Sequence, residues 1–409
     1  MRVLHVNNVD LLGNRFNGHD MQIALNKRGI AASQVVMERM GDDPHTIPLA
    51  GGPHEPYLRR RLMECERELS LHGMIYPYLY RLMELPEFQK ADVVHYHLLH
   101  NYFGSLPVLP EITAKKPSVL TIHDPWLFTG HCIYPLECIR WERGCGQCPH
   151  LDVNFPMKED RTALQWAVKR EVLSRSKLDL IVASAYMLEL VRRSPITRGI
   201  EQVHLIPFGI DTTLFSAERD RREVRRRLSI PEANIVLSFR ADPSRFKGFD
   251  CIKRMLDQLR VKEPVTLLAV GNPGMLSAYE RRFQVIDLSW VTDNSLMADI
   301  YCASDIFLMP STAEAFGLMA IEAMAAGRPV VVCEGTSLPG VTFAPECGVV
   351  VPQDDSEALC RAVTRLIGHP EERRARGEAG RRLAQENYQF DDYVNRHLAV
   401  YEDMLRRGQ

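Results

Sequence analysis

Short runs of Val, Ile and Leu recur along this chain and alternate with stretches in which apolar residues return every three or four positions. The runs that predict buried strands of a first domain are residues 3–6, 91–95, 118–122, 178–183 and 203–206. Those that predict strands of a second domain are residues 235–239, 266–270, 305–309 and 329–333. Strands that alternate with helices form βαβ units with parallel sheets covered on both faces. The pattern therefore predicts an α/β chain with two parallel-sheet domains.

Length and turn signals place the boundary between these domains. A chain of 409 residues is too long for one compact core. The turn sequence Pro207-Phe-Gly-Ile-Asp211 follows the last strand of the first domain. We expect a first domain over residues 1–206, a second over 207–388 and a C-terminal amphipathic helix over 389–409.

Charge and hydropathy exclude several classes of partner. The formal net charge is -2, which gives no overall attraction to nucleic acid. No stretch approaches the roughly 20 apolar residues of a membrane-spanning helix, and the N-terminus lacks the features of a signal peptide. We expect a cytoplasmic protein with reduced thiols.

Two carboxylates flank the start of a predicted helix after the strand at residues 305–309. Glu314 lies in the loop, and Glu322 lies eight residues later inside the helix. Unpaired N–H groups and the positive dipole end of that helix suit phosphate or sugar oxygens. A carboxylate accepts two hydrogen bonds side by side, which suits vicinal hydroxyls. Gly13, in a glycine-hinged loop after the first strand, is a weaker candidate for anion binding.

The segment Glu314-x7-Glu322, followed by Ala-Met-Ala-x-Gly-x-Pro-Val-Val, resembles the retaining GT-B glycosyltransferases of family 4. Further matches follow the family's order over nearly the whole chain, at residues 180–190, 203–215, 239–248 and 354–359. The resemblance implies two Rossmann-like domains whose parallel sheets face a central cleft. It also implies that the helix at 389–409 crosses back to the first domain.

The same resemblance assigns roles to residues of the second domain. Arg240 and Lys247 would neutralise the diphosphate of a nucleotide-sugar donor, so catalysis would need no metal and no cofactor. Glu322 would bind the ribose, and Glu314 would contact the transferred sugar. The further donor contacts would be the backbone N–H groups of Ala315, Phe316, Gly317 and Leu318, and the base would lie against Trp290 and Val291. In the simpler alternative, these charged residues are ordinary surface groups.

Histidines follow two strands of the first domain and predict its share of the site. His123 and Asp124 close the strand at 118–122, and ligands of such sheets bind beyond the carboxyl ends of the strands. In the resembling family a histidine here lies beside the transferred sugar, so we name His123 with Glu314 as catalytic. Asp124, His97 and His100 are candidates for acceptor contacts, although packing explains His97 and His100 equally well.

Four of the ten cysteines gather in a loop over residues 130–150. Cys132, Cys138, Cys145 and Cys148 end in a Cys-x-x-Cys step, and neighbouring glycines allow the tight turn of a zinc knuckle. We favour a structural zinc ion, with His131 or His150 as a possible replacement for one sulfur. Packing thiols and disulfide or redox chemistry are the alternatives. The loop also resembles a cysteine-rich insert in a bacterial polysaccharide-assembly branch of the family.

Together these observations predict a retaining, metal-independent hexosyltransferase. Its acceptor would be a glycan or lipid-linked saccharide in bacterial surface polysaccharide synthesis. A basic amphipathic stretch at residues 57–63 is compatible with peripheral contact at the inner face of the plasma membrane, or with a solvated helix. The rival functions are a nucleotide-sugar epimerase or glycan phosphorylase on the same fold, and a non-catalytic glycan-binding protein.

Overall fold

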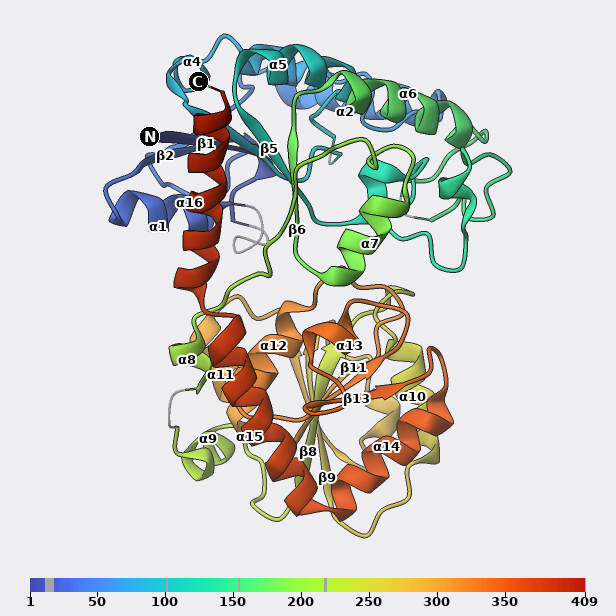
Figure 1. The fold of residues 1–409 in the computed structure, drawn as a ribbon. Helices are drawn as coiled ribbons and strands as arrows, with labels where there is room; N and C mark the ends of the chain where they lie inside the picture. Colours follow the sequence, from blue (N-terminus) through green and yellow to red (C-terminus); the bar gives the residue numbers. More distant parts are fainter. Residues whose placement is uncertain (12–17, 101, 154, 217–218, 409) are drawn as a thin grey trace. The chain divides into compact units, whose positions relative to one another are not determined.

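The computed structural model describes residues 1–11, 18–100, 102–153, 155–216 and 219–408 (Figure 1). Gly13, predicted as an anion contact, lies outside the described residues. The chain divides into two compact units. Unit 1 comprises Met1–Ile206 with Val394–Gln409, and unit 2 comprises Pro207–Tyr393.

Unit 1 contains a seven-stranded parallel sheet with the order β3-β2-β1-β4-β5-β6-β7. Its strands are β1 (Arg2–Val9), β2 (Ala31–Glu38), β3 (Thr46–Pro48), β4 (Val93–Tyr96), β5 (Ser118–Ile122), β6 (Asp179–Val182) and β7 (Val203–Leu205). Its helices are α1 (His19–Lys27), α2 (Glu55–Glu68), α3 (Tyr78–Leu82), α4 (Pro86–Lys90), η1 (Leu106–Val108), α5 (Leu109–Lys115), η2 (Pro125–Phe128), η3 (Arg140–Glu142), α6 (Thr162–Arg175) and α7 (Ala185–Arg193).

Unit 2 repeats this plan with a six-stranded parallel sheet in the order β10-β9-β8-β11-β12-β13. Its strands are β8 (Ile235–Ala241), β9 (Val265–Gly271), β10 (Gln284–Ser289), β11 (Ile306–Met309), β12 (Val330–Cys333) and β13 (Gly348–Val351). Its helices are α8 (Thr212–Ser216), α9 (Arg221–Arg227), α10 (Phe249–Gln258), η4 (Ser277–Tyr279), α11 (Asn294–Ala303), α12 (Leu318–Ala325), α13 (Leu338–Val341), α14 (Ser356–Gly368) and α15 (Pro370–Asn387).

The strand order of each sheet reverses at its middle. In unit 1 the chain builds outward from β1 to β3 and then returns to place β4 on the other side of β1. In unit 2 the reversal lies between β8 and β11. A crevice forms beyond the carboxyl ends of the strands at such a reversal, and ligands bind there in open α/β sheets.

The two parallel sheets confirm the predicted α/β fold, and all nine predicted strands are present. Four strands were not predicted: β2, β3, β10 and β13. β3, β10 and β13 are edge strands, whereas β2 is mostly buried and its apolar run is interrupted by Ser33 and Gln34. In β10, for example, no residue is fully buried.

The last helix, α16 (Phe390–Arg407), passes from residues of unit 2 into residues of unit 1. Within unit 1, the Tyr401 hydroxyl and His95 Nδ1 lie 2.7 Å apart, and Arg407 pairs with Asp179 at the start of β6. Burial disfavours the ionised form of Asp179, but its partners His204 and Arg407 keep its pKa below the usual value. In the part of the chain that the structure describes, no helix is long and apolar enough to cross a membrane.

Candidate active site

The four charged residues predicted to bind a donor come from the middle of the unit 2 sheet. Arg240 is the penultimate residue of β8, and Lys247 lies in the loop between β8 and α10. Glu314 lies in the loop between β11 and α12, and Glu322 lies within α12. Since β8 and β11 are neighbours, both loops leave the same edge of the sheet. Lys247 Nζ and Glu314 Oε2 form an ion pair of 2.9 Å.

Two glycines allow these loops to approach each other. Gly248 has φ +69°, and a Cβ at this position would lie 2.0 Å from the carbonyl oxygen of Pro310. Gly317 has φ +107°, and its Cβ would lie 2.4 Å from Leu338. A side chain at position 248 would force the loops apart, and one at position 317 would displace Leu338 of α13, so both positions need glycine.

The remaining donor residues are held by partners that the sequence did not reveal. Glu322 is only 3% exposed, and its Oε2 accepts a 2.9 Å hydrogen bond from the hydroxyl of Tyr301. Arg240 pairs with Asp242, and its guanidinium lies 4.7 Å from the ring centre of Trp290. Trp290 is 51% exposed, so much of its surface is available to a ligand.

The segment before α12 has the form expected of an oxygen-binding turn. Gly317 is the N-cap of α12 and adopts a left-handed conformation, and Leu318 is the first helical residue. Ala315 and Phe316 are buried, and the hydroxyl of Ser337 donates to the Phe316 carbonyl. The early N–H groups of a helix have no partner within it. Val291, predicted beside the base, is half-buried next to Trp290.

In unit 1 two of the predicted histidines, His97 and His123, form a hydrogen-bonded row with His5, which was not predicted. His97 Nδ1 lies 3.2 Å from His123 Nε2, and His97 Nε2 lies 3.2 Å from His5 Nδ1. His5 and His97 are buried, whereas His123 is partly exposed and lines a small cavity with Asp124 and His100. The structure therefore places His97 as a support for His123.

Burial keeps these imidazoles uncharged. It lowers the pKa of His5 to about 3, with a smaller effect from His397. It also lowers the pKa of His123 to about 3, against the opposing charge of Asp124. A neutral imidazole has one donor and one acceptor nitrogen. The hydrogen bonds along the row therefore all run in the same direction, with each ring donating to the next.

Asp124 fixes the turn that follows His123. One carboxylate oxygen accepts a 2.9 Å hydrogen bond from the backbone N–H of Trp126, which caps η2, and the other lies 3.2 Å from His100 Nε2. Burial opposes ionisation of Asp124, but His100 and the Trp126 N–H outweigh it and lower its pKa. The structure thus brings His123, Asp124, His97 and His100 together at the carboxyl ends of β4 and β5.

Comparisons with known proteins agree with this geometry. A family model described as Glycosyltransferase Family 4 matches residues 18–214, and one described as Glycosyl transferases group 1 matches residues 233–369. The chain belongs to glycosyltransferase family 4. Apart from Gly13, the predicted site residues of both units fall within these matches. The two parallel-sheet units agree with the GT-B fold of this family.

Individual relatives have low sequence identity to this chain. MMP alpha-(1->4)-mannosyltransferase of Mycolicibacterium hassiacum is 30% identical over 51% of this chain and 50% of its own length. The putative colanic acid biosynthesis glycosyl transferase WcaC of Escherichia coli is 26% identical over 58% of this chain and 59% of its own. The chain thus spans about half the length of the curated relatives it matches. Anabaena HepE, solved with UDP-glucose, superimposes with a TM-score of 0.67 over 98% of this chain and 100% of its own, at 16% identity.

The cysteine loop of this family 4 chain closes around a small cavity in unit 1. Cys132, Cys138, Cys145 and Cys148 all line it, and all four are free thiols. The ligand atoms of His131, Cys132 and Cys148 lie within 4.8 Å of one another. Four successive residues, Gly144 to Gln147, have positive φ, which gives the tight turn expected of a metal knuckle. The turn and the close group of His131, Cys132 and Cys148 fit a zinc ion, whereas the thiols of Cys138 and Cys145 lie outside that group.

A buried lysine lies beside this loop and was not predicted. Lys169 in α6 is fully buried, and its Nζ donates to the carbonyl oxygens of Trp126 and Thr129 at 2.6 and 3.1 Å. Burial lowers its pKa to about 7, against the opposing influence of Cys145, Cys132 and Asp124. Lys169 therefore connects the cysteine loop to the turn after His123, and its positive charge would balance thiolates on a metal.

A second group of close histidines in unit 1 is better explained without a metal. Nitrogens of His5, His95 and His97 lie within 4.8 Å of one another. However, His95 Nδ1 lies 2.7 Å from the Tyr401 hydroxyl, and His95 Nε2 lies 2.7 Å from Thr121 Oγ1. With both nitrogens of His95 engaged, the group is a hydrogen-bonded network.

Proposed function

We propose that the chain is a retaining glycosyltransferase that moves a sugar from a nucleotide-sugar donor to a glycan or lipid-linked acceptor in bacterial surface polysaccharide synthesis. The observation that carries the proposal is the convergence of Arg240, Lys247, Glu314 and Glu322 at the reversal point of the unit 2 sheet. The likeness to WcaC supports the polysaccharide role, and HepE with UDP-glucose supports a nucleotide-sugar donor.

In this proposal the donor diphosphate displaces Glu314 from Lys247. Arg240 and Lys247 then stabilise the negative charge that grows on the leaving group, so transfer needs no divalent metal. Glu314, once released, accepts hydrogen bonds from the transferred sugar, together with the N–H groups of residues 315–318. Glu322, oriented by Tyr301, accepts from the ribose hydroxyls.

We propose that His123 acts as a neutral hydrogen-bond donor to the reacting sugar. Along this row the protons can point in either direction. We propose the direction in which the His5 proton is on Nδ1, because it leaves His123 with its proton on the ring nitrogen that lies outside the row. His5 then donates to His97, and His97 Nδ1–H donates to His123 Nε2. The remaining proton of His123 is on Nδ1.

The tautomer can be read by nuclear magnetic resonance of ¹⁵N-histidine-labelled protein. We expect the Nδ1-protonated form for His123 and its loss in His5→Gln or His97→Gln. An Nε2-protonated His123 in the wild type would contradict the assignment.

We also propose that Cys132, Cys138, Cys145 and Cys148 hold a structural zinc ion. Zinc would supply charge and rigidity to the loop, and Lys169 would offset part of the negative charge of four thiolates. The proposal rests on the shared cavity and the left-handed turn. His131 is the alternative ligand, which His131→Gln would test by its zinc content.

The proposal includes a peripheral membrane contact through α2. Tyr57 and Leu58 are exposed beside Arg60 and Arg61, as membrane-surface binding would need. Flotation with vesicles of phosphatidylglycerol and phosphatidylethanolamine tests it. Protein that stays at the bottom of the gradient at low salt would remove this contact.

The central test is a thermal-shift screen of UDP-, GDP- and ADP-sugars, followed by turnover assays with glycan acceptors. A donor at one hundred times its Kd should stabilise the protein by roughly 2.7 kcal/mol. Glu322→Gln should weaken the shift, whereas Glu357→Gln, on the exposed face of α14, should not. An epimerase would convert the nucleotide sugar without acceptor, and a glycan-binding protein would show no shift with any donor. The anomeric configuration of the product tests retention.

A further inference from the structure

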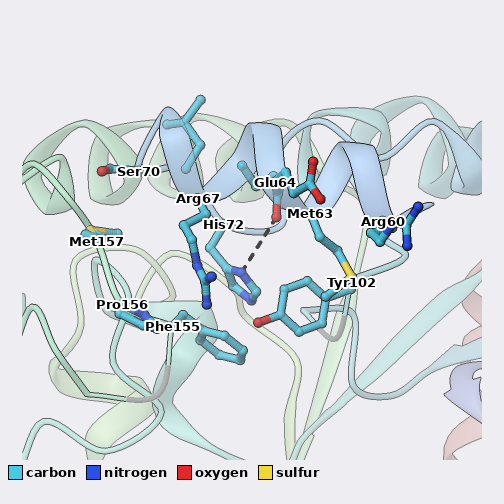
Figure 2. Close-up of a pocket in the computed structure, with 12 residues that line it drawn as sticks. Arg60, Met63, Glu64, Arg67, Ser70, His72, Tyr102, Phe155, Pro156 and Met157 are labelled. Atoms are coloured by element: carbon cyan, nitrogen blue, oxygen red, sulfur yellow. Dashed lines mark ion pairs between the residues drawn. The ribbon is translucent and has the colours of Figure 1, made fainter. Parts of the chain in front are cut away.

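Unit 1 contains a cavity of about 170 Å³ that none of the roles above uses. One wall is α2, and the others come from the segment after α2, from Tyr102 and from residues 155–157. Figure 2 shows Arg67 and His72 reaching toward Phe155, with Tyr102 on the other side of His72.

The charges of α2 distinguish this cavity from an ordinary surface hollow. Arg59 and Arg61 form ion pairs with neighbouring glutamates. Among the described residues, no carboxylate forms an ion pair with Arg60 or Arg67, and these are the two arginines of α2 that line the cavity. Seven residues apart, they lie on one face of the helix. The cavity therefore offers guanidinium groups that no protein carboxylate neutralises.

Two carboxyl groups belong to the cavity wall, and Glu64 pairs with Arg61. Glu66 is 2% exposed, and its Oε1 accepts hydrogen bonds from the backbone N–H groups of Met74 and Ile75 at 2.9 and 3.3 Å. Burial raises the pKa of Glu66 to about 7, although these backbone hydrogen bonds lower it. Its other oxygen lies 3.6 Å from His72 Nδ1. Glu66 thus holds the loop after α2 and His72 in place, and these groups within the protein compensate its charge.

The rest of the lining suits a sugar ring. His72 stacks on Phe155 at 3.6 Å between ring centres, and Tyr102 meets both rings edge-on. Tyr102 and Phe155 are half-buried, so parts of their rings face the cavity. Pockets for small ligands combine such aromatic walls with a few polar groups.

Packed rings connect the wall of the cavity to the acceptor side of the candidate active site. His72 packs edge-on against Trp126, with 5.9 Å between ring centres, and Trp126 stacks on His100 at 4.8 Å. His100 in turn contacts Asp124, the residue after His123. A ligand that fills the cavity lies against the same aromatic cluster that shapes the strand end.

We propose that this cavity binds an acidic sugar of the acceptor, a pyranose that carries a carboxylate or a phosphate. Arg67 and Arg60 bind the anionic group, for which a guanidinium has the matching planar geometry. Phe155 and Tyr102 contact the ring. The assignment to the acceptor rests on the proposed glycosyltransferase function, whereas the anion-binding site itself does not.

The experiment observes the cavity directly in the full-length protein. Met63 and Met157 line it, so their ¹³C-methyl resonances, assigned with Met63→Leu and Met157→Leu, report occupancy. The probes are glucuronate, glucose 6-phosphate and neutral methyl glucoside. We expect both methyl signals to shift with at least one acidic sugar and not with methyl glucoside. The stronger of the two acidic sugars identifies the anionic group.

The variants Arg67→Gln and Arg60→Gln/Arg67→Gln should weaken the acidic probe by about tenfold or more, the loss of a charge-assisted hydrogen-bond pair. Arg61→Gln, a paired arginine on the same helix, should bind as the wild type does. The proposal would be overturned if neither methyl resonance shifted with either acidic sugar, or if methyl glucoside bound equally well. If nucleotide sugars stabilise the protein but the cavity stays silent, only this inference fails. If acidic sugars bind and no nucleotide sugar does, the proposed function fails and the site remains.

Discussion

The two units hold their functional side chains by different physical means. In unit 2 the donor residues are charged, come from β8, α12 and the loops beside them, and are held by charged or polar partners, as Lys247 is by Glu314. In unit 1 the histidines form a hydrogen-bonded row in which His97 lies between His5 and His123, and burial keeps His5 and His123 uncharged. Charged pairs near a surface add little to stability, whereas buried polar networks add much when satisfied. Substitutions should therefore affect activity alone in unit 2, and folding as well in unit 1.

The strongest test of this contrast in unit 2 is Lys247→Ala. Loss of the positive charge that stabilises the leaving group should reduce kcat by about 100- to 1000-fold. The melting temperature should change little, because the pair that is lost is partly exposed. Lys253→Ala, which removes a lysine of α10 paired with Asp250, is the control for turnover and melting. A large fall in stability with Lys247→Ala would show that the donor site is also structural.

In unit 1 the largest effect should come from the cysteine loop. Cys145→Ser should release the zinc ion and destabilise unit 1 by several kcal/mol, because binding energy of a structural metal is folding energy. Metal analysis and thermal unfolding measure both effects, and Cys302→Ser, at a half-buried position outside the loop, is the control. Wild-type protein purified without chelator that contains less than about half an equivalent of zinc would sink the metal proposal.

The contrast also explains which features the sequence could predict. Arg240, Lys247, Glu314 and Glu322 stand in short motifs whose order is visible along the chain, and the strands that carry them are continuous apolar runs. The partners of the unit 1 residues come from distant segments. Lys169 lies about 40 residues after the carbonyl groups it binds, and Tyr401 lies 306 residues after His95. No local pattern predicts such contacts.

Edge strands were missed for a related reason. Burial on both faces gives a central strand its apolar run, and β10 lacks that burial and has Asp287 within it. β13 is apolar but short, with Val349 to Val351 after Gly348. The roles of Tyr301 and Asp242 were also missed, since a tyrosine in a helix and an aspartate in a loop are common. The position of Asp242, two residues after Arg240, is a local signal that could have indicated this partner.

Acid titration tests whether the unit 1 network is neutral. A buried histidine with pKa about 3 binds no proton between pH 5 and 4, whereas the same residue in the unfolded chain, with its ordinary pKa of 6.5, is protonated. Its contribution to stability is therefore lost as the pH falls below 6.5, by about 1.4 kcal/mol per pH unit. His5→Gln should reduce the slope of unfolding free energy against pH in this window by about that amount. An unchanged slope would mean that His5 is charged in the folded state.

The smallest expected effect concerns unit 2. It tests whether the buried contact between Tyr301 and Glu322 serves donor binding alone. Tyr301→Phe removes the hydrogen bond to Glu322 Oε2 and leaves both side chains packed. Loss of one such bond costs about 1 kcal/mol, so KM for the donor should rise roughly fivefold while kcat stays nearly constant. Tyr279→Phe is the matched control, because its hydroxyl also donates within unit 2, to the carbonyl of Lys253. If both variants lose stability equally and neither changes KM, Tyr301 supports the fold and does not orient Glu322. If only Tyr301→Phe changes KM, the donor site extends into the core of unit 2, and the contrast between the units is one of degree.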